Sequence, residues 1–129
     1  AMEPQLLILD EPMAGLDHAM RKDLLDVLDQ LHQRGITLLL ATHDIDFAYR
    51  WADRIHLIAD GRCAAAFDAA DLADEADALA TAGLPMPGVV ELHRQLAMRG
   101  VLDHQTGSRM PRSTQELIAL LEQTTKEIQ

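Results

Sequence analysis

Two continuous apolar runs, residues 6–9 (LLIL) and 36–41 (ITLLLA), flank a segment whose apolar residues recur at helical spacing. Runs without alternation are typical of strands buried on both faces of a parallel sheet. The helical positions between them are Met20, Leu24, Leu25, Val27, Leu28 and Leu31. Asp17 is suited to cap the start of this helix, and Gly35 to end it. The pattern predicts a βαβ unit, whose crossover is almost always right-handed.

A second pattern follows directly. A short helix is predicted after Asp44, with one apolar face formed by Ile45, Ala48, Trp51 and Ala52. Residues 54–59 then predict a strand, Asp60-Gly61 a two-residue hairpin turn, and residues 62–67 its partner. The partner strand has a weak signal because three consecutive alanines have poor strand propensity.

From residue 69 onward the composition shifts to alanine and aspartate, and three helices are predicted. The first ends at Gly83. The second begins near Pro87 and ends at Gly100, with one face formed by Val89, Leu92, His93 and Leu96. A turn-rich loop, 104–112, precedes the third, which starts with a capping box at 113–116 (STQE). The predicted organisation is an α/β part, 1–67, followed by a helical extension, 68–129.

Composition narrows the class of protein. The 129 residues carry a formal net charge of −10, which repels phosphate backbones and argues against a nucleic-acid partner. Hydrophobic residues make up 48%, too many for a disordered chain. The single cysteine, Cys63, cannot form an internal disulfide, and no apolar run approaches the ~20 residues that cross a bilayer. We expect a soluble cytoplasmic protein.

Candidate chemistry lies at the ends of the two apolar strands. Asp10 and Glu11 follow the first strand and His43 follows the second. Carboxyl ends of neighbouring parallel strands meet at one edge of a sheet, where ligands collect. An aspartate there can hold Mg²⁺, a second carboxylate can polarise a water molecule, and an imidazole can donate a hydrogen bond to a phosphate oxygen. The arrangement suits phosphoryl transfer to water.

Each residue taken singly has an ordinary explanation. Asp10-Glu11 could be a plain strand exit, His43 a solvated residue beside a helix cap, and Asp17 an N-cap with or without another role. The six histidines show no short ligand pair of the kind that holds a metal, and Cys63 is expected to be a small packed side chain. The order and spacing of the residues favour the chemical interpretation.

Three motifs carry a family resemblance. Residues 6–12 (LLILDEP) resemble the Walker B segment of ABC-type ATPases, 14–17 (AGLD) resemble the D-loop, and 41–44 (ATHD) resemble the switch-histidine motif. The hairpin that turns at Asp60-Gly61 is similar to the strand pair that closes the sheet of these ATPases. The resemblance covers residues 1 to about 67, and three motifs in order are far more specific than any one alone.

The resemblance implies a role for each matching residue. Asp10 would help to hold Mg²⁺ with the nucleotide, and Glu11 would be the catalytic carboxylate that acts on water. His43 would sense the γ-phosphate of ATP. Asp17 would lie at the interface with a second ATPase subunit, identical or related, because in this family each nucleotide is sandwiched between two subunits.

The chain also departs from the family pattern. The phosphate-binding loop with its lysine, the glutamine loop and the LSGGQ signature do not occur in these 129 residues. Residues 1–4 (AMEP) resemble the tail of the helix that follows the signature. The chain therefore resembles the C-terminal part of the P-loop ATPase sheet with a helical tail. Met2 could also begin a truncated reading frame, with Ala1 a cloning remnant.

The helical extension adds a finer resemblance. Residues 82–87 (AGLPMP) and the two helices after them are similar to the C-terminal extension of ATPases in energy-coupling-factor importers, especially those for cobalt and nickel. That resemblance implies integral-membrane transporter subunits as partners and a peripheral position on the inner face of the cell membrane. It also implies that the extension helps to hold two ATPase subunits together.

Two other functions remain open at this point. The chain could be a non-catalytic dimerisation or regulatory module of the same fold, because strands without their neighbours expose an edge that recruits another chain by edge pairing or strand exchange. In the family, the strand equivalent to 36–41 pairs with the phosphate-loop strand. A DNA-maintenance ATPase would share the acidic and histidine motifs, but the acidic charge and the lack of coiled-coil heptads argue against it.

We predict that the 129-residue chain alone binds Mg-ATP negligibly, because it lacks the backbone nest and lysine that hold the phosphates. Isothermal titration calorimetry of the chain with Mg-ATP should show no heat of binding in the micromolar range. Micromolar affinity would contradict this prediction.

Overall fold

The computed structural model describes residues 5–102 and 110–128, with side chains described up to Gln123. By its contacts the chain divides into two compact units, residues 1–43 and 44–129. The expectation that an α/β part ends at residue 67 stays a prediction. The expected tail of the signature helix (residues 1–4) and most of the expected loop (104–112) lie outside the described residues.

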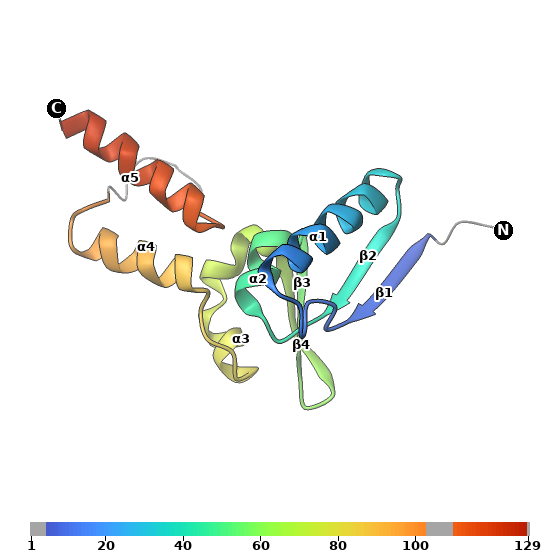
Figure 1. The fold of residues 1–129 in the computed structure, drawn as a ribbon. Helices are drawn as coiled ribbons and strands as arrows, with labels where there is room; N and C mark the ends of the chain where they lie inside the picture. Colours follow the sequence, from blue (N-terminus) through green and yellow to red (C-terminus); the bar gives the residue numbers. More distant parts are fainter. Residues whose placement is uncertain (1–4, 103–109, 129) are drawn as a thin grey trace. The chain divides into compact units, whose positions relative to one another are not determined.

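The first unit is the predicted βαβ unit (Figure 1). Strand β1 (Leu6–Asp10) pairs in parallel with β2 (Thr37–Ala41), and helix α1 (His18–Gln33) connects them. Asp17 caps α1, since its carboxylate accepts the amide of Met20 at 2.9 Å. Gly35, with a φ of +90°, takes the left-handed conformation that ends the helix. The predicted cap and stop residues are therefore confirmed.

One expectation about this unit is wrong: the strands are not buried on both faces. Exposure alternates along β1 and β2, and Leu6, Ile8 and Leu39 are 50%, 64% and 49% exposed. The register places Leu6 beside Thr37 and Ile8 beside Leu39. We call these three apolar residues the bare sheet face. On the other side of the sheet the leucines of both strands are half-buried, and α1 packs against β2.

The second unit starts with helix α2 (Ile45–Trp51) and the hairpin of β3 (Arg54–Ala59) and β4 (Arg62–Asp68). Asp60 and Gly61 both have positive φ, as a tight hairpin turn requires, so the predicted turn is confirmed. Among the described residues the hairpin forms a two-stranded sheet of its own, so it does not extend the β1–β2 sheet.

Helical segments complete the second unit (Figure 1): η1 (Ala69–Asp74), α3 (Ala76–Thr81), α4 (Gly88–Met98) and α5 (Thr114–Ile128). The first helix expected in the extension is thus a 3₁₀ turn followed by a short α-helix. One apolar cluster of the unit is aliphatic apart from Tyr49 and Phe67, and its fully buried members include Leu72, Leu79 and Val90. This cluster involves α2, the hairpin, η1, α3 and α4.

Two details of the predicted helices need correction, and the cap predicted for the last helix is present. In α2 the buried side chains are Ile45, Phe47 and Tyr49, because packing reaches round a helix of only seven residues. In α4 the buried residues are Val90 and Ala97, whereas Leu92 is half-exposed. At α5 the hydroxyl of Ser113 accepts the Glu116 amide at 3.2 Å, as a cap should.

Candidate functional site

The candidate site is built at the carboxyl end of the β1–β2 ladder. The register pairs Asp10 with Ala41, and the ladder continues one residue further, where the Glu11 amide donates to the Ala41 carbonyl at 2.8 Å. Since the two strands are parallel and end together, the residues that follow them are neighbours in space. This pairing brings residue 11 beside residues 42 and 43 within the first unit.

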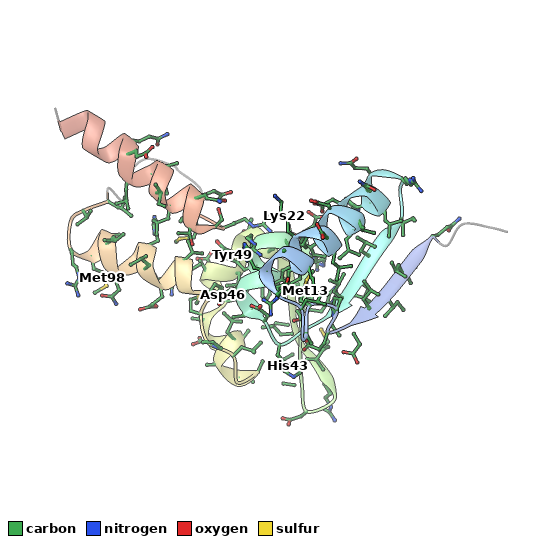
Figure 2. All side chains as sticks on the ribbon, in the orientation of Figure 1. Met13, Lys22, His43, Asp46, Tyr49 and Met98 are labelled. Atoms are coloured by element: carbon green, nitrogen blue, oxygen red, sulfur yellow. The ribbon has the colours of Figure 1, made fainter. Side chains whose placement is uncertain are left out.

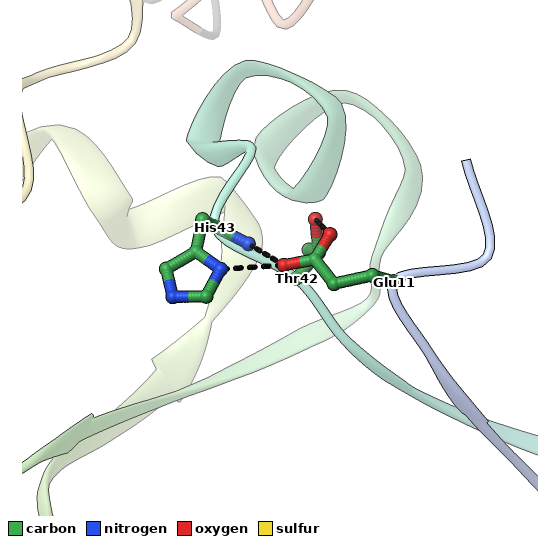
Figure 3. A network of polar contacts seen from close by, with 3 residues as sticks. All are labelled: Glu11, Thr42 and His43. Carbon is green, nitrogen blue, oxygen red and sulfur yellow. Dashed lines mark hydrogen bonds and ion pairs between the residues drawn. The ribbon is translucent and has the colours of Figure 1, made fainter. Parts of the chain in front are cut away.

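The Glu11 carboxylate is bound by three groups of the second strand's exit loop (Figure 3). Its Oε1 accepts the His43 backbone amide at 2.7 Å and lies 2.5 Å from His43 Nδ1. Its Oε2 accepts the Thr42 hydroxyl at 3.1 Å. A carboxylate can only accept, so the contact with the ring requires a proton on Nδ1. That leaves Nε2 of His43 directed to other partners, as an acceptor when the ring is neutral and a donor when it is protonated.

Hydrogen bonding by His43 lowers the pKa of Glu11 from its ordinary value of 4.5, with a smaller opposing effect of desolvation and further lowering by Thr42. Glu11 is therefore a carboxylate at neutral pH. Each of its oxygens has two lone pairs, and Oε2 accepts only the Thr42 hydroxyl among the bonds described. An ionised carboxylate with acceptor capacity to spare can orient and polarise a water molecule.

The backbone at Glu11 is unusual. Its φ of +46° lies in the left-handed region, which a residue with a side chain adopts only when the surroundings hold it there. Here the amide is held by Ala41, the carbonyl accepts from Ala14 at 3.1 Å, and the carboxylate is held by the Thr42-His43 loop. Outliers of this kind gather at functional sites, where local strain is compensated by the surrounding contacts.

His43 and Glu11 differ in their exposure to solvent. The His43 side chain is 95% exposed and that of Glu11 is 35% exposed. Such exposure screens the charge interaction, so its contribution to stability is small. An imidazole open to solvent, fixed at one nitrogen by a carboxylate, is free to meet a ligand with the other nitrogen.

The structure thus brings together Glu11 and His43, as the sequence predicted, while Asp10 and Asp17 occupy separate places in the same unit. Asp10 ends β1 with an exposed carboxylate, and Asp17 is the N-cap of α1. The roles of all four residues remain predictions. Sequence analysis missed the part that Thr42 plays. The sequence does place a hydroxyl side chain between the end of the second strand and His43, and this position could have indicated a hydrogen bond to Glu11.

The Asp10 carboxylate is a suitable ligand for Mg²⁺, provided that a nucleotide and water supply the other ligands. Within the described residues there is no group of three or more His, Cys, Asp or Glu side chains that could hold a metal ion by itself. A single exposed carboxylate at a strand end, such as Asp10, matches the way Mg²⁺ is bound by one or two carboxylates together with phosphate oxygens and water.

Comparisons with known proteins show that this chain is similar in sequence to ATP-binding proteins of transporters. Residues 1–47 match the family model described as "AAA domain, putative AbiEii toxin, Type IV TA system". The chain is 38% identical over 95% of its length to the energy-coupling factor transporter ATP-binding protein EcfA2 of Methanospirillum hungatei, and 35% identical over 94% to EcfA2 of Lactococcus lactis. It is 45% identical over 95% to a Streptomyces coelicolor protein described as an ABC transporter ATP-binding protein.

These alignments span only part of each relative: 30%, 41% and 42% of their respective lengths. The chain has the mixed α/β fold of part of a P-loop ATPase domain of the AAA and ABC type, which confirms the predicted fold class. It is homologous to the ATP-binding proteins of ABC transporters over about 95% of its own length. Within the described residues, no helix has the length and apolarity needed to cross a membrane.

We predict that His43→Ala raises the pKa of Glu11 toward its ordinary value of 4.5, because the largest cause of the lowering is removed. A lowered pKa in the folded state contributes stability above the unfolded pKa, and this contribution disappears as pH falls through the folded value. NMR titration of the Glu11 side-chain carboxyl carbon measures the midpoint directly. His32→Ala, at an exposed position on α1, is the matched control and should leave the midpoint unchanged. Equal midpoints in the wild type and His43→Ala would contradict the prediction.

Proposed function

We propose that this chain is the C-terminal portion of the ATP-hydrolysing subunit of an energy-coupling-factor importer. The observation that carries the proposal is the Glu11 carboxylate held against Thr42 and His43 at the carboxyl end of a parallel strand pair. The similarity to EcfA2 proteins over most of the chain supports the same class. Because the chain spans under half of these relatives, the activity belongs to the complete protein.

In this proposal each site residue has one task. Asp10 supplies a carboxylate ligand to Mg²⁺ bound with ATP, and the ion offsets negative charge on the phosphates. Glu11 accepts a hydrogen bond from the attacking water and orients it. His43 donates to the terminal phosphate from Nε2 in its protonated form, since Nδ1 already carries the proton that binds Glu11. Thr42 keeps the Glu11 carboxylate turned toward the His43 loop. Asp17 contributes to the contact with the second ATPase subunit.

Catalysis by such a site is mainly positioning and electrostatic stabilisation. The three hydrogen bonds to Glu11 reduce its rotamer freedom before substrate arrives, so less entropy is lost when water is positioned. The pKa lowering keeps Glu11 ionised at neutral pH, which is the form that polarises water. The phosphate-binding loop does not occur in these 129 residues, so the chain alone is not expected to hydrolyse ATP.

The partners follow from the class. Integral-membrane transporter subunits would bind the ATPase at the inner face of the cell membrane, and a second ATPase subunit, identical or related, would complete each nucleotide site. Cobalt or nickel uptake is the finer proposal, and it rests on the resemblance of residues 82–87 and the helices after them to the extension of those importers. The metal would be the cargo of the membrane subunits.

A non-catalytic dimerisation or regulatory module is the second candidate. The bare sheet face (Leu6, Ile8, Leu39) favours it, because half-exposed apolar side chains on a two-stranded parallel sheet offer a surface to another chain. Two-stranded sheets are marginally stable alone, so association through the free edges would stabilise this unit. A domain-swapped or edge-paired dimer of the chain would result.

The proposed ATPase function is tested first by the DNA immediately upstream of this coding region. An in-frame phosphate-binding loop and signature define the complete protein, which is then purified for activity measurements. Glu11→Gln in that protein should lower the rate of ATP hydrolysis about 10²–10⁴-fold, since it removes the carboxylate that acts on water. ATP binding should persist. Glu122→Gln, at an exposed position on α5, is the control and should hydrolyse ATP at the wild-type rate.

Two results would refute the ATPase assignment. One is an upstream sequence without the loop and signature, which would favour the module of the second candidate. The other is a Glu11→Gln protein that hydrolyses ATP as fast as the wild type.

The second candidate predicts that the 129-residue chain is a dimer in solution. Light scattering coupled to size exclusion should give twice the monomer mass of 14.3 kDa. Ile8→Lys, which puts a charge on the bare sheet face, should shift the mass toward the monomer. Ile58→Lys is the matched control, since Ile58 lies on the hairpin with the same 64% exposure. A wild-type chain that is a stable monomer at all concentrations counts decisively against this candidate.

A further inference from the structure

Helix α2, which begins two residues after His43, is bound at its first turn by the start of α4. Asp46 lies in that turn, and its Oδ1 accepts the backbone amide of Gly88 at 2.7 Å. Gly88 is the first residue of α4, where amides have no partner within the helix. The Asp46 carboxylate therefore caps α4 from another helix, with the charge that the N-terminal end of a helix prefers.

The other end of α2 is bound by the segment that leads into α5. Arg112 donates from Nε to the Tyr49 carbonyl at 2.9 Å and from Nη2 to the Ala52 carbonyl. The Tyr49 hydroxyl in turn donates to the Pro111 carbonyl at 3.0 Å, and the Arg112 guanidinium lies 5.8 Å from the centre of the Tyr49 ring. Asp46 and Tyr49, labelled in Figure 2, both lie on α2.

The contacts of Tyr49 and Arg112 are shielded from water, whereas the bond between Asp46 and Gly88 is exposed. Tyr49 is fully buried and Pro111 is among the fully buried residues, so water competes little for the bonds between them. Arg112 is itself held, because its backbone amide donates to Glu116 Oε2 at 2.7 Å within the first turn of α5. The guanidinium fills acceptors that the last turn of α2 leaves free and places positive charge at the helix C-terminus.

A helix of seven residues is too short to be stable without such support. Its N-cap is Asp44, whose carboxylate accepts the Phe47 amide at 3.0 Å and whose carbonyl accepts the Ala48 amide at 3.0 Å. Asp44 is joined directly to His43, whose backbone amide and ring both bind Glu11. The conformation of α2 therefore constrains the peptide that presents His43.

We propose that Arg112 and Asp46 are positioning residues through which the C-terminal helices control the His43 segment. With α4 and α5 attached, α2 stays wound and the His43 amide stays in place for Glu11. When a partner draws α4 or α5 away, α2 loses support at both ends and the Glu11–His43 contact loosens. The inference uses the proposed function only for the significance of His43, since the coupling itself needs no nucleotide.

The test uses the whole 129-residue chain, labelled for NMR, without nucleotide. Arg112→Ala and Asp46→Ala should speed amide hydrogen exchange of Ala48 and Ala52 about tenfold or more, because a charge-assisted hydrogen bond is lost. Both variants should also shift the His43 amide resonance, which reports its bond to Glu11. Arg112→Lys, whose single ammonium cannot reach both carbonyls in the same way, should give a smaller shift.

Arg50→Ala is the matched control, because Arg50 is an exposed arginine on α2 itself. It should change neither exchange at Ala48 and Ala52 nor the His43 resonance. Faster exchange in α2 with an unmoved His43 amide would overturn the proposal, since Arg112 and Asp46 would then be structural only. Equal shifts in Arg50→Ala would overturn it as well. If Arg112→Ala does not fold, Asp46→Ala and Arg112→Lys decide by the same criteria.

Failure here and failure of the proposed function are distinguishable. A His43 resonance that ignores Arg112 and Asp46 refutes the coupling and leaves the ATPase assignment standing. A complete protein that hydrolyses ATP without Glu11 refutes the ATPase assignment and leaves the measured coupling unchanged.

Discussion

The parallel pairing of β1 with β2 is the constraint on which the candidate site depends. It places Asp10 beside Ala41 and extends one further hydrogen bond to Glu11, so that the residues after both strands meet. Without that pairing, a glutamate and a histidine 32 positions apart would have no reason to touch. The left-handed backbone at Glu11 and the three hydrogen bonds to its carboxylate both follow from the shared end of the ladder.

One face of the sheet formed by β1 and β2 is largely exposed to solvent. Leu6, Ile8 and Leu39 remain half-exposed or more, and β1 and β2 have no third strand among the described residues. Apolar surface left in water weakens the sheet that holds the site, because its burial is the main stabilising contribution available to so small a unit. Whatever covers the bare sheet face would therefore also stabilise the geometry of Glu11 and His43.

The C-terminal helices stabilise α2 through long-range hydrogen bonds. A seven-residue helix, α2, takes part in the core of the second unit through Tyr49 and Ile45. Residues far along the chain contact both of its ends, since Gly88 donates to Asp46 and Arg112 donates to the Tyr49 carbonyl. Glu116 illustrates how tertiary context redirects a local motif. Its side chain binds the amide of Arg112 where a standard capping box would bind that of Ser113, and this choice holds Arg112 against α2.

The sequence by itself determined the βαβ unit, the Asp17 cap, the Gly35 stop and the Asp60-Gly61 turn, because hydrophobic period, caps and turns are local properties. It also placed Glu11 and His43 at one sheet edge, since parallel strands align their ends. Only the tertiary structure decided that β1 and β2 expose one face, that the hairpin is a separate sheet, and that Thr42 and Arg112 bind distant acceptors. Burial and long-range hydrogen bonds depend on which segments meet in space, and no local pattern encodes that.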